Sequence, residues 1–214
     1  MSTMSLQWRR PIMSMLLLAC MSTVCVAQTL DLTANATSLF GTWSSGSGAV
    51  ITGPDFADPL NSDRTFSPPA TTGIAISFTN DGYFEQAQYR FNANGSDPHC
   101  STAVLIWQHG TYQLHNNGSL TLDPSPFQSD GRVQVQDPCG PQTEVLTYYS
   151  QFELYNGWTI QVDLHHETYV MQLYRFDGSL YPRLYLTMRP PAMLPTTYLT
   201  AIYNGTESIT DATK

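Results

Sequence analysis

The sequence has 214 residues, of which 12% are aromatic and 12% are charged, and its formal net charge is −8 at pH 7. Its single lysine is Lys214, so the chain offers no basic surface for the phosphates of nucleic acid or for anionic lipid. This length and composition are typical of one globular domain, and we expect no nucleic-acid partner.

The first 27 residues have the pattern of a secretory signal peptide. Arg9 and Arg10 form a basic start, residues 12–24 are largely apolar, and small residues end at Ala27 before Gln28. The apolar stretch is shorter than the about 20 residues that a membrane-spanning helix needs, although an uncleaved anchor is the alternative. We expect cleavage after Ala27 and transfer of the chain into the secretory pathway.

Four glycosylation sequons and one cysteine pair fit this pathway. Because Cys20 and Cys25 belong to the signal peptide, Cys100 and Cys139 are the only cysteines of the mature chain and allow a single connectivity. A redox or metal role is the alternative, but the sequence contains no CxxC motif. We therefore expect a structural disulfide, and N-glycosylation at the sequons that begin at Asn35, Asn94, Asn117 and Asn204.

Short alternating or apolar runs predict antiparallel strands in the first half of the mature chain. In residues 74–78, large apolar side chains alternate with small ones, and Asp81-Gly82 predicts a turn that leads into a second strand over residues 83–91. Residues 103–107 are apolar on both faces. Residues 107–122 flank Asn117-Gly118, which predicts a hairpin whose type I′ turn gives both of these residues a positive φ.

The second half continues the pattern. Residues 132–136 follow Asp130-Gly131, and residues 145–154 place Leu146, Tyr148, Phe152 and Leu154 on one face of a strand. Asn156-Gly157 then leads into a strand over 158–164. Residues 168–176 and 180–188 form a last hairpin around Asp177-Gly178, in which Pro182 indicates an edge position or a bulge.

These strands predict an all-β fold in one domain over residues 28–195. The fold is either a single antiparallel β-barrel of the lipocalin or calycin type or a two-sheet β-sandwich, since either arrangement removes or protects strand edges. Tight hairpins join the strands and one disulfide links them. Residues 44–72 predict a long ordered loop across the sheet, and residues 196–214 an irregular C-terminal tail without a transmembrane helix.

Candidate chemical groups occur as pairs rather than as larger clusters. A zinc site needs three or four converging ligands, so exposed or hairpin-end histidines are the favoured interpretation of His109, His115, His165 and His166. Glu85 lies on an otherwise apolar face and is either a buried functional carboxylate or a residue near water at a strand end. Asp163 and Glu167 flank a turn, as a solvated hairpin end or as a glycosidase-like pair. We expect no enzyme activity and no catalytic, cofactor or metal site.

Five sequence blocks, in the same order, resemble the fungal endoplasmic-reticulum chaperones known as the Reversal Of TOR lethality family. The blocks are FGTWSSGSGAVITGPDFADP (40–59), ISFTNDGYFEQAQYRF (76–91), CSTAVLIWQHGTYQLHNNGSLTL (100–122), DGRVQVQDPC (130–139) and LYRFDGSLYPRLYLTMRPPAMLP (173–195). The resemblance covers nearly all of the mature chain.

This resemblance implies a glycosylated folding factor whose partners are unfolded or maturing secretory proteins and possible co-chaperones, and which normal cell-wall β-1,6-glucan requires. It implies no cofactor and no catalytic residue. Family members usually end in a transmembrane helix, which we do not expect here, so the location is the endoplasmic reticulum, in its lumen or at its membrane, or outside the cell. Binding of a small apolar ligand is the alternative function, because Gly41-Thr42-Trp43 resembles the start of lipocalin barrels.

Overall fold

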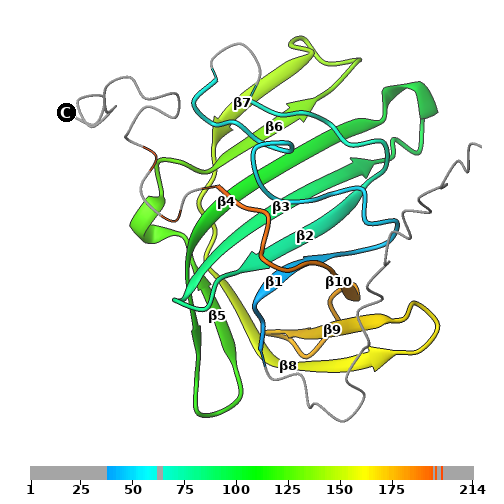
Figure 1. Ribbon diagram of the computed structural model, residues 1–214. Coiled ribbons are helices and arrows are strands. Elements are labelled where there is room, and N and C mark those ends of the chain that lie inside the picture. The colour runs from blue at the N-terminus through cyan, green and yellow to red at the C-terminus, as the bar shows by residue number, and fades with distance from the viewer. Residues whose placement is uncertain (1–37, 62–64, 195, 197–198, 200–214) are drawn as a thin grey trace, which may run out of the picture.

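The computed structural model describes residues 38–61, 65–194, 196 and 199, and strands dominate this part of the chain (Figure 1). It contains two short 3₁₀ helices, η1 (Pro98–Cys100) and η2 (Ser125–Phe127), and no α-helix among these residues. The expected signal peptide (1–27), Asn35, Asn204 and most of the expected tail (196–214) lie outside the described residues. The strands are β1 (Gly41–Ser44), β2 (Gly73–Phe78), β3 (Tyr83–Asn92), β4 (Thr102–Leu114), β5 (Leu120–Asp123), β6 (Arg132–Gln136), β7 (Glu144–Tyr148), β8 (Glu153–Asp163), β9 (Thr168–Arg175) and β10 (Leu184–Met188).

All ten strands belong to one antiparallel sheet, which confirms the all-β prediction. The order of hydrogen-bonded neighbours is β3-β2-β1-β10-β9-β8-β5-β4-β6-β7, and β3 also pairs with β4. The pairings from β3 through β1, β10, β8 and β5 to β4 therefore close on themselves, whereas β6 and β7 extend from β4 outside this circuit. In Figure 1, β6 and β7 lie at the end of the molecule opposite β8 and β9. Within the described chain, no helix combines the length and apolar character that a membrane crossing requires.

Several predicted turns form at the expected residues. The chain reverses at Gly82 (φ 91°) between β2 and β3 and at Gly178 (φ 81°) after β9, because glycine adopts a positive φ without a steric penalty. The β4–β5 hairpin also forms, but its predicted type I′ turn is wrong. Gly118 has a positive φ and Asn117 does not, so glycine alone supplies the left-handed residue of this turn.

Two of the predicted strands have different bounds. Residues 145–154 form two strands instead of one, since β7 ends at Tyr148 and β8 begins at Glu153. Asn156-Gly157 lies inside β8, where the register against β9 shifts, so this pair marks a bulge. Pro182 precedes β10 and therefore removes no hydrogen bond from it, although β10 lies between β1 and β9 and is not an edge.

Each face of the sheet carries a cluster of buried apolar side chains. One face carries a cluster of large buried side chains around Trp43, Phe78, Phe84, Leu122 and Leu173. The other face carries a second cluster around Leu105 and Trp107, which the loop between β1 and β2 covers with Val50, Phe56 and Phe66. This loop is the predicted ordered segment across the sheet. It positions the buried polar groups described below.

Cys100 and Cys139 form a disulfide across 39 residues of sequence. Cys100 ends η1, with Ser101 between it and β4, and Cys139 lies in the connection between β6 and β7. The bond therefore ties the far end of the β6–β7 hairpin to the start of β4.

Replacing both cysteines with serine should lower the free energy of unfolding by about 4 kcal/mol, because the unfolded chain without the disulfide has more conformational entropy than the crosslinked one. Urea unfolding of the oxidised wild type and of the double variant measures the difference. Wild type treated with a reducing agent should match the variant. Equal stability of the oxidised wild type and the variant would contradict the structural role of this bond.

Candidate functional site

β4 changes its partner halfway along its length. On one side it pairs with β3 from Thr102 to Thr111. On the other side residues 103–107 pair with β6 and residues 111–114 pair with β5. Residues 108–110 thus have no strand partner on this side among the described residues, and we call them the branch point.

Side chains replace the missing strand pairing at the branch point. The Gln108 amide accepts a hydrogen bond from the Gln151 backbone N–H at 2.9 Å and donates to the Gln151 carbonyl at 3.1 Å. It also donates to Gln86 at 2.8 Å. Gln108 therefore holds the connection between β7 and β8 against the sheet.

Close backbone contacts at the branch point require two glycines. A Cβ atom on Gly110 would lie 2.1 Å from the Asp123 carbonyl oxygen, and one on Gly131 would lie 2.0 Å from the Tyr149 carbonyl oxygen. Both distances are far below van der Waals contact. A side chain at Gly110 would push the end of β5 away from β4, and one at Gly131 would push the end of β7 away from the start of β6.

His109 is buried at the branch point, which corrects the prediction of an exposed histidine. Its Nε2 atom lies 2.8 Å from the Asp130 carboxylate, and both side chains are almost inaccessible to water. The imidazole stacks on Phe127 with ring centroids 4.5 Å apart. Asp130 also accepts a hydrogen bond from the Leu199 backbone N–H at 2.9 Å. The sequence did not indicate this pair, because its members are 21 residues apart and belong to different elements.

Glu85 is completely buried on the same face of the sheet, opposite His109 in the β3–β4 register. Its carboxylate accepts hydrogen bonds from Trp107 Nε1 at 2.8 Å and from the backbone N–H groups of Gly53 and Leu194. Burial raises the pKa of Glu85 above its ordinary value of 4.5, while these three hydrogen bonds and the charge effect of His109 lower it to a smaller extent. Glu85 thus joins the β1–β2 loop and the segment after β10 to the sheet.

A partly buried carboxylate, Glu153, lies on the opposite face. It accepts hydrogen bonds from Gln86, the neighbour of Glu85 in β3, and from Tyr155. Burial raises the pKa of Glu153, and the hydrogen bonds from Tyr155 and Gln86 oppose this shift. Because adjacent residues of a strand point to opposite faces, Glu85 and Glu153 do not face a common cleft.

The most exposed apolar stretch of the described chain is residues 145–154. Five large hydrophobic side chains of this segment are exposed, namely Val145, Leu146, Tyr148, Phe152 and Leu154. All five residues of β7 are exposed, and Tyr148 keeps 72% of its surface accessible although the Arg132 guanidinium lies 4.3 Å from the centre of its ring. The sequence predicted that four of these residues share one face of a single strand, but they are divided between β7, the connection after it and β8. It did not show that these side chains would be turned to solvent.

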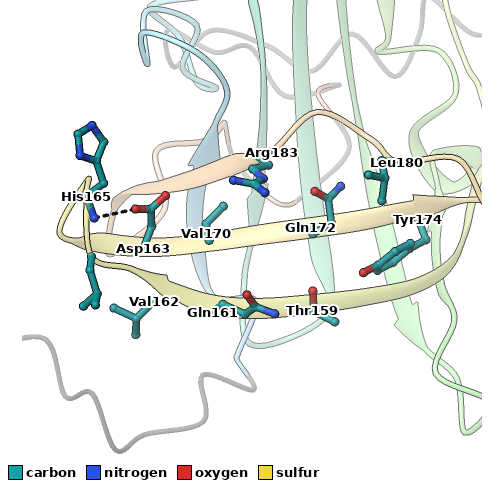
Figure 2. A pocket seen from close by; sticks show the side chains of 11 residues that line it. Thr159, Gln161, Val162, Asp163, His165, Val170, Gln172, Tyr174, Leu180 and Arg183 are labelled. Atoms are coloured by element: carbon teal, nitrogen blue, oxygen red, sulfur yellow. Dashed lines mark hydrogen bonds between the residues drawn. The ribbon is translucent and has the colours of Figure 1, made fainter.

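A groove of about 620 Å³ lies over β8 and β9, and Figure 2 shows its lining side chains. Thr159, Gln161 and Gln172 line its length, and the chain that leads into β10 borders it with Leu180 and Arg183. Gln172 fixes this border by donating a hydrogen bond to the Tyr181 carbonyl at 2.6 Å. Polar and apolar side chains therefore line the groove together, and Leu164 and Leu180 are its exposed large hydrophobic residues.

The structure brings two of the predicted polar residues, Asp163 and His165, together at one end of this groove (Figure 2). Asp163 accepts hydrogen bonds from the backbone of His165 and His166 and contacts His166 Nδ1 at 3.1 Å. The backbone and side-chain hydrogen bonds of His166 lower the pKa of Asp163. This arrangement is a capped hairpin turn, in which Glu167 has a positive φ of 51°.

His115 is exposed in the β4–β5 hairpin and contacts Thr121 at 2.9 Å. The described part of the chain contains no group of three or more His, Cys, Asp or Glu side chains that could hold a metal ion.

Comparisons with known proteins agree on one family. A family model named Rot1, described as a chaperone for protein folding within the endoplasmic reticulum of fungi, matches residues 39–214. A protein named ROT1 from Yarrowia lipolytica is 46% identical over 175 residues, which are 81% of this chain and 69% of that protein. ROT1 from Vanderwaltozyma polyspora is 48% identical over 180 residues, covering 83% and 68% of the two chains. For rot1 from Schizosaccharomyces pombe the identity is 45% over 159 residues, covering 74% and 67%. No solved structure matches the chain.

Replacing Glu85 with glutamine should destabilise the fold by about 1–3 kcal/mol near pH 5, because an amide NH2 group would then face one of the backbone N–H donors where the carboxyl group presents an oxygen. Urea unfolding measures this loss. Glu144→Gln on the exposed β7 is the matched control and should change stability by less than about 0.5 kcal/mol.

The same pair of proteins tests the raised pKa of Glu85. Folded wild type binds this proton more tightly than unfolded wild type, so the contribution of Glu85 to the free energy of unfolding falls as the pH rises from 4.5 through the folded pKa. Glu85→Gln lacks this contribution. The stability difference between wild type and Glu85→Gln should therefore shrink over this range, and a difference that grows with pH would contradict the assignment.

Proposed function

The chain belongs to the Rot1 family of fungal chaperones for protein folding in the endoplasmic reticulum, and from this premise we propose that it binds unfolded segments of maturing secretory proteins through residues 145–154. The observation that carries this proposal is the exposure of five large hydrophobic side chains within ten residues. Soluble proteins rarely expose such a concentration of apolar surface unless it binds a partner.

Binding without catalysis is the activity that the described residues favour. The buried carboxylate of Glu85 and the partly buried carboxylate of Glu153 accept hydrogen bonds that hold the fold together, and they lie on opposite faces of the sheet. The polar groups beside the groove also serve the turn between β8 and β9. A chaperone of this kind would hold apolar segments of its client until they are buried in the client's own core.

The sheet is proposed to be a closed antiparallel barrel rather than a sandwich. Support comes from the closed pairing order of eight strands, completed by the long β3–β4 ladder. Large side chains, among them Trp43, Phe84 and Met171, pack together on the enclosed face. A packed interior is typical of small barrels without an internal ligand, so we place the small-ligand function second.

Further expectations come from the resemblance to the family. We propose that residues 1–27 are a cleaved signal peptide, that the chain works in the lumen of the endoplasmic reticulum, and that its clients include proteins needed for β-1,6-glucan of the cell wall. The connection to glucan would then be indirect, through the folding of the enzymes that make it.

We also propose N-glycosylation at Asn35, Asn94, Asn117 and Asn204. Of these, Asn94 and Asn117 are described, and both are exposed. The Asn117 side chain accepts hydrogen bonds from Ser119 through its Oδ1 atom, at the tip of the β4–β5 hairpin.

Peptide mapping of the chain made in a fungal host, before and after glycosidase treatment, should find glycans on both Asn94 and Asn117, because an exposed hairpin tip is accessible to the transferring enzyme. A variant with Asn117→Gln is the control and should lose the glycan at this position alone. Unmodified Asn117 in the wild-type protein would contradict the proposed site.

The double variant Leu146→Ser/Tyr148→Ser should suppress the aggregation of a heat-unfolding secretory protein about tenfold less effectively than wild type, since it loses apolar contact area with the client. Light scattering at increasing chaperone concentration gives the amount needed for half suppression. The matched control is Phe176→Ser/Leu180→Ser, because Phe176 is 71% exposed, close to the 72% of Tyr148.

The control variant should retain the activity of wild type. A loss confined to the control would move the client site to the groove over β8 and β9. Absence of suppression by wild type itself would overturn the proposed function.

A further inference from the structure

β7 is the last strand of the sheet, with β6 as its only strand partner among the described residues. Hydrogen bonds from Tyr149 to Gly131 and from Asp137 to Thr143 fix the β6–β7 register. Because hydrogen-bonded and non-hydrogen-bonded pairs alternate in an antiparallel ladder, the backbone groups of Val145 and Thr147 point toward β6. Those of Glu144, Leu146 and Tyr148 point away from it, along the open edge.

Among the described residues, this edge lacks the features that usually protect edge strands. Natural proteins place lysine, proline or a bulge on such strands, or cover them with other elements, in order to prevent pairing with other chains. β7 has the sequence EVLTY, pairs with β6 without a register shift, and exposes every residue. Its one charged residue, Glu144, lies at its start. An unprotected edge of this kind can accept another strand.

The faces of β7 indicate which strand it can accept. Val145 lies on the same face as its partner Val135, and on that face Val135 and Val133 pair with Val104 and Ile106 of β4. Leu146 and Tyr148 occupy the opposite face. A strand added to β7 would therefore meet apolar neighbours on both of its faces. A continuous apolar run, of the type that forms a strand buried on both faces in a folded protein, fits this environment better than an alternating one.

Charge adds a second criterion. The chain has a formal net charge of −8, and Glu144 begins the open edge. Acidic residues at the ends of an incoming segment would be repelled, whereas lysine or arginine would be attracted.

We propose that β7 captures a client by strand addition, in which an extended apolar segment flanked by basic residues pairs with the outward backbone groups of Leu146 and Tyr148. This inference rests on the proposed chaperone function and specifies its binding mode and its class of client segment. It differs from side-chain contact alone, because the affinity depends on main-chain hydrogen bonds.

The test uses the full mature chain and a fluorescent peptide with a run of about five valine and isoleucine residues between lysines. Fluorescence anisotropy measures its dissociation constant. Leu146→Pro removes the outward N–H of Leu146 and leaves the bonds to β6 intact, since proline is tolerated where the N–H of an edge strand faces solvent. Leu146→Thr keeps that N–H and is the matched control.

Strand addition predicts that Leu146→Pro weakens peptide binding about tenfold or more, and that Leu146→Thr weakens it less than about threefold. Thermal unfolding of both variants checks that each is folded. A second arm leaves the protein unchanged: a peptide methylated on every amide nitrogen of the run keeps the side chains and should lose binding. Replacing the lysines of the peptide with glutamate should also weaken its binding to wild type.

Three results would overturn strand addition and leave the chaperone function in place. In the first, wild type suppresses client aggregation, but Leu146→Pro binds the unmodified peptide as tightly as wild type does, and wild type binds the methylated peptide as tightly as the unmodified one. In the second, wild type suppresses aggregation and binds none of the peptides. In the third, sedimentation shows that wild type is a dimer and Leu146→Pro a monomer, and that the peptide does not dissociate the wild-type dimer. The edge would then be occupied by a second copy of the chain. If wild type neither suppresses aggregation nor binds peptide, the proposed function fails as well.

Discussion

The change of partner along β4 is the constraint on which the rest of the structure depends. If β4 paired with β5 along its whole length, the sheet would close without β6 and β7. If it paired with β6 throughout, β5 could not complete the circuit. Gln108 bridges the gap through the backbone of Gln151, and the buried contact between His109 and Asp130 fixes the start of β6 beside it. Residues 108–110 thus allow β5 to complete the circuit of eight strands while β6 and β7 extend outside it.

The buried acidic side chains around residues 108–110 hold other parts of the chain against the sheet. Glu85 and Asp130 accept backbone hydrogen bonds from Leu194 and Leu199, so the segment after β10 is held over Trp107 and the second hydrophobic cluster. Removing one partner from such a buried network leaves the others unsatisfied, which is more costly than the loss of an exposed contact. The network fixes Asp130, directly before β6, and β6 is the strand with which β7 pairs.

Local sequence predicted the all-β class and the turns at Asp81-Gly82 and Asp177-Gly178, because a glycine that must adopt a positive φ leaves a local signal. Resemblance to the family predicted the chaperone role. The sequence did not predict that residues 145–154 form two strands, since the alternation of apolar and polar residues does not reveal which strands will pair. Asn156-Gly157 resembles a turn in sequence but forms a bulge in β8. The burial of His109 depends on Asp130 and Phe127, which only the three-dimensional fold brings to it.

Backbone hydrogen exchange of the full mature chain, with and without an excess of an unfolding secretory client, tests the central claim most directly. The amides of Val145 and Thr147 face β6, whereas those of Leu146 and Tyr148 face the open edge. The account predicts that the client slows exchange at Leu146 and Tyr148 and changes little elsewhere. Slower exchange confined to the groove, at Gln161 and Leu164, with β7 unchanged, would contradict it.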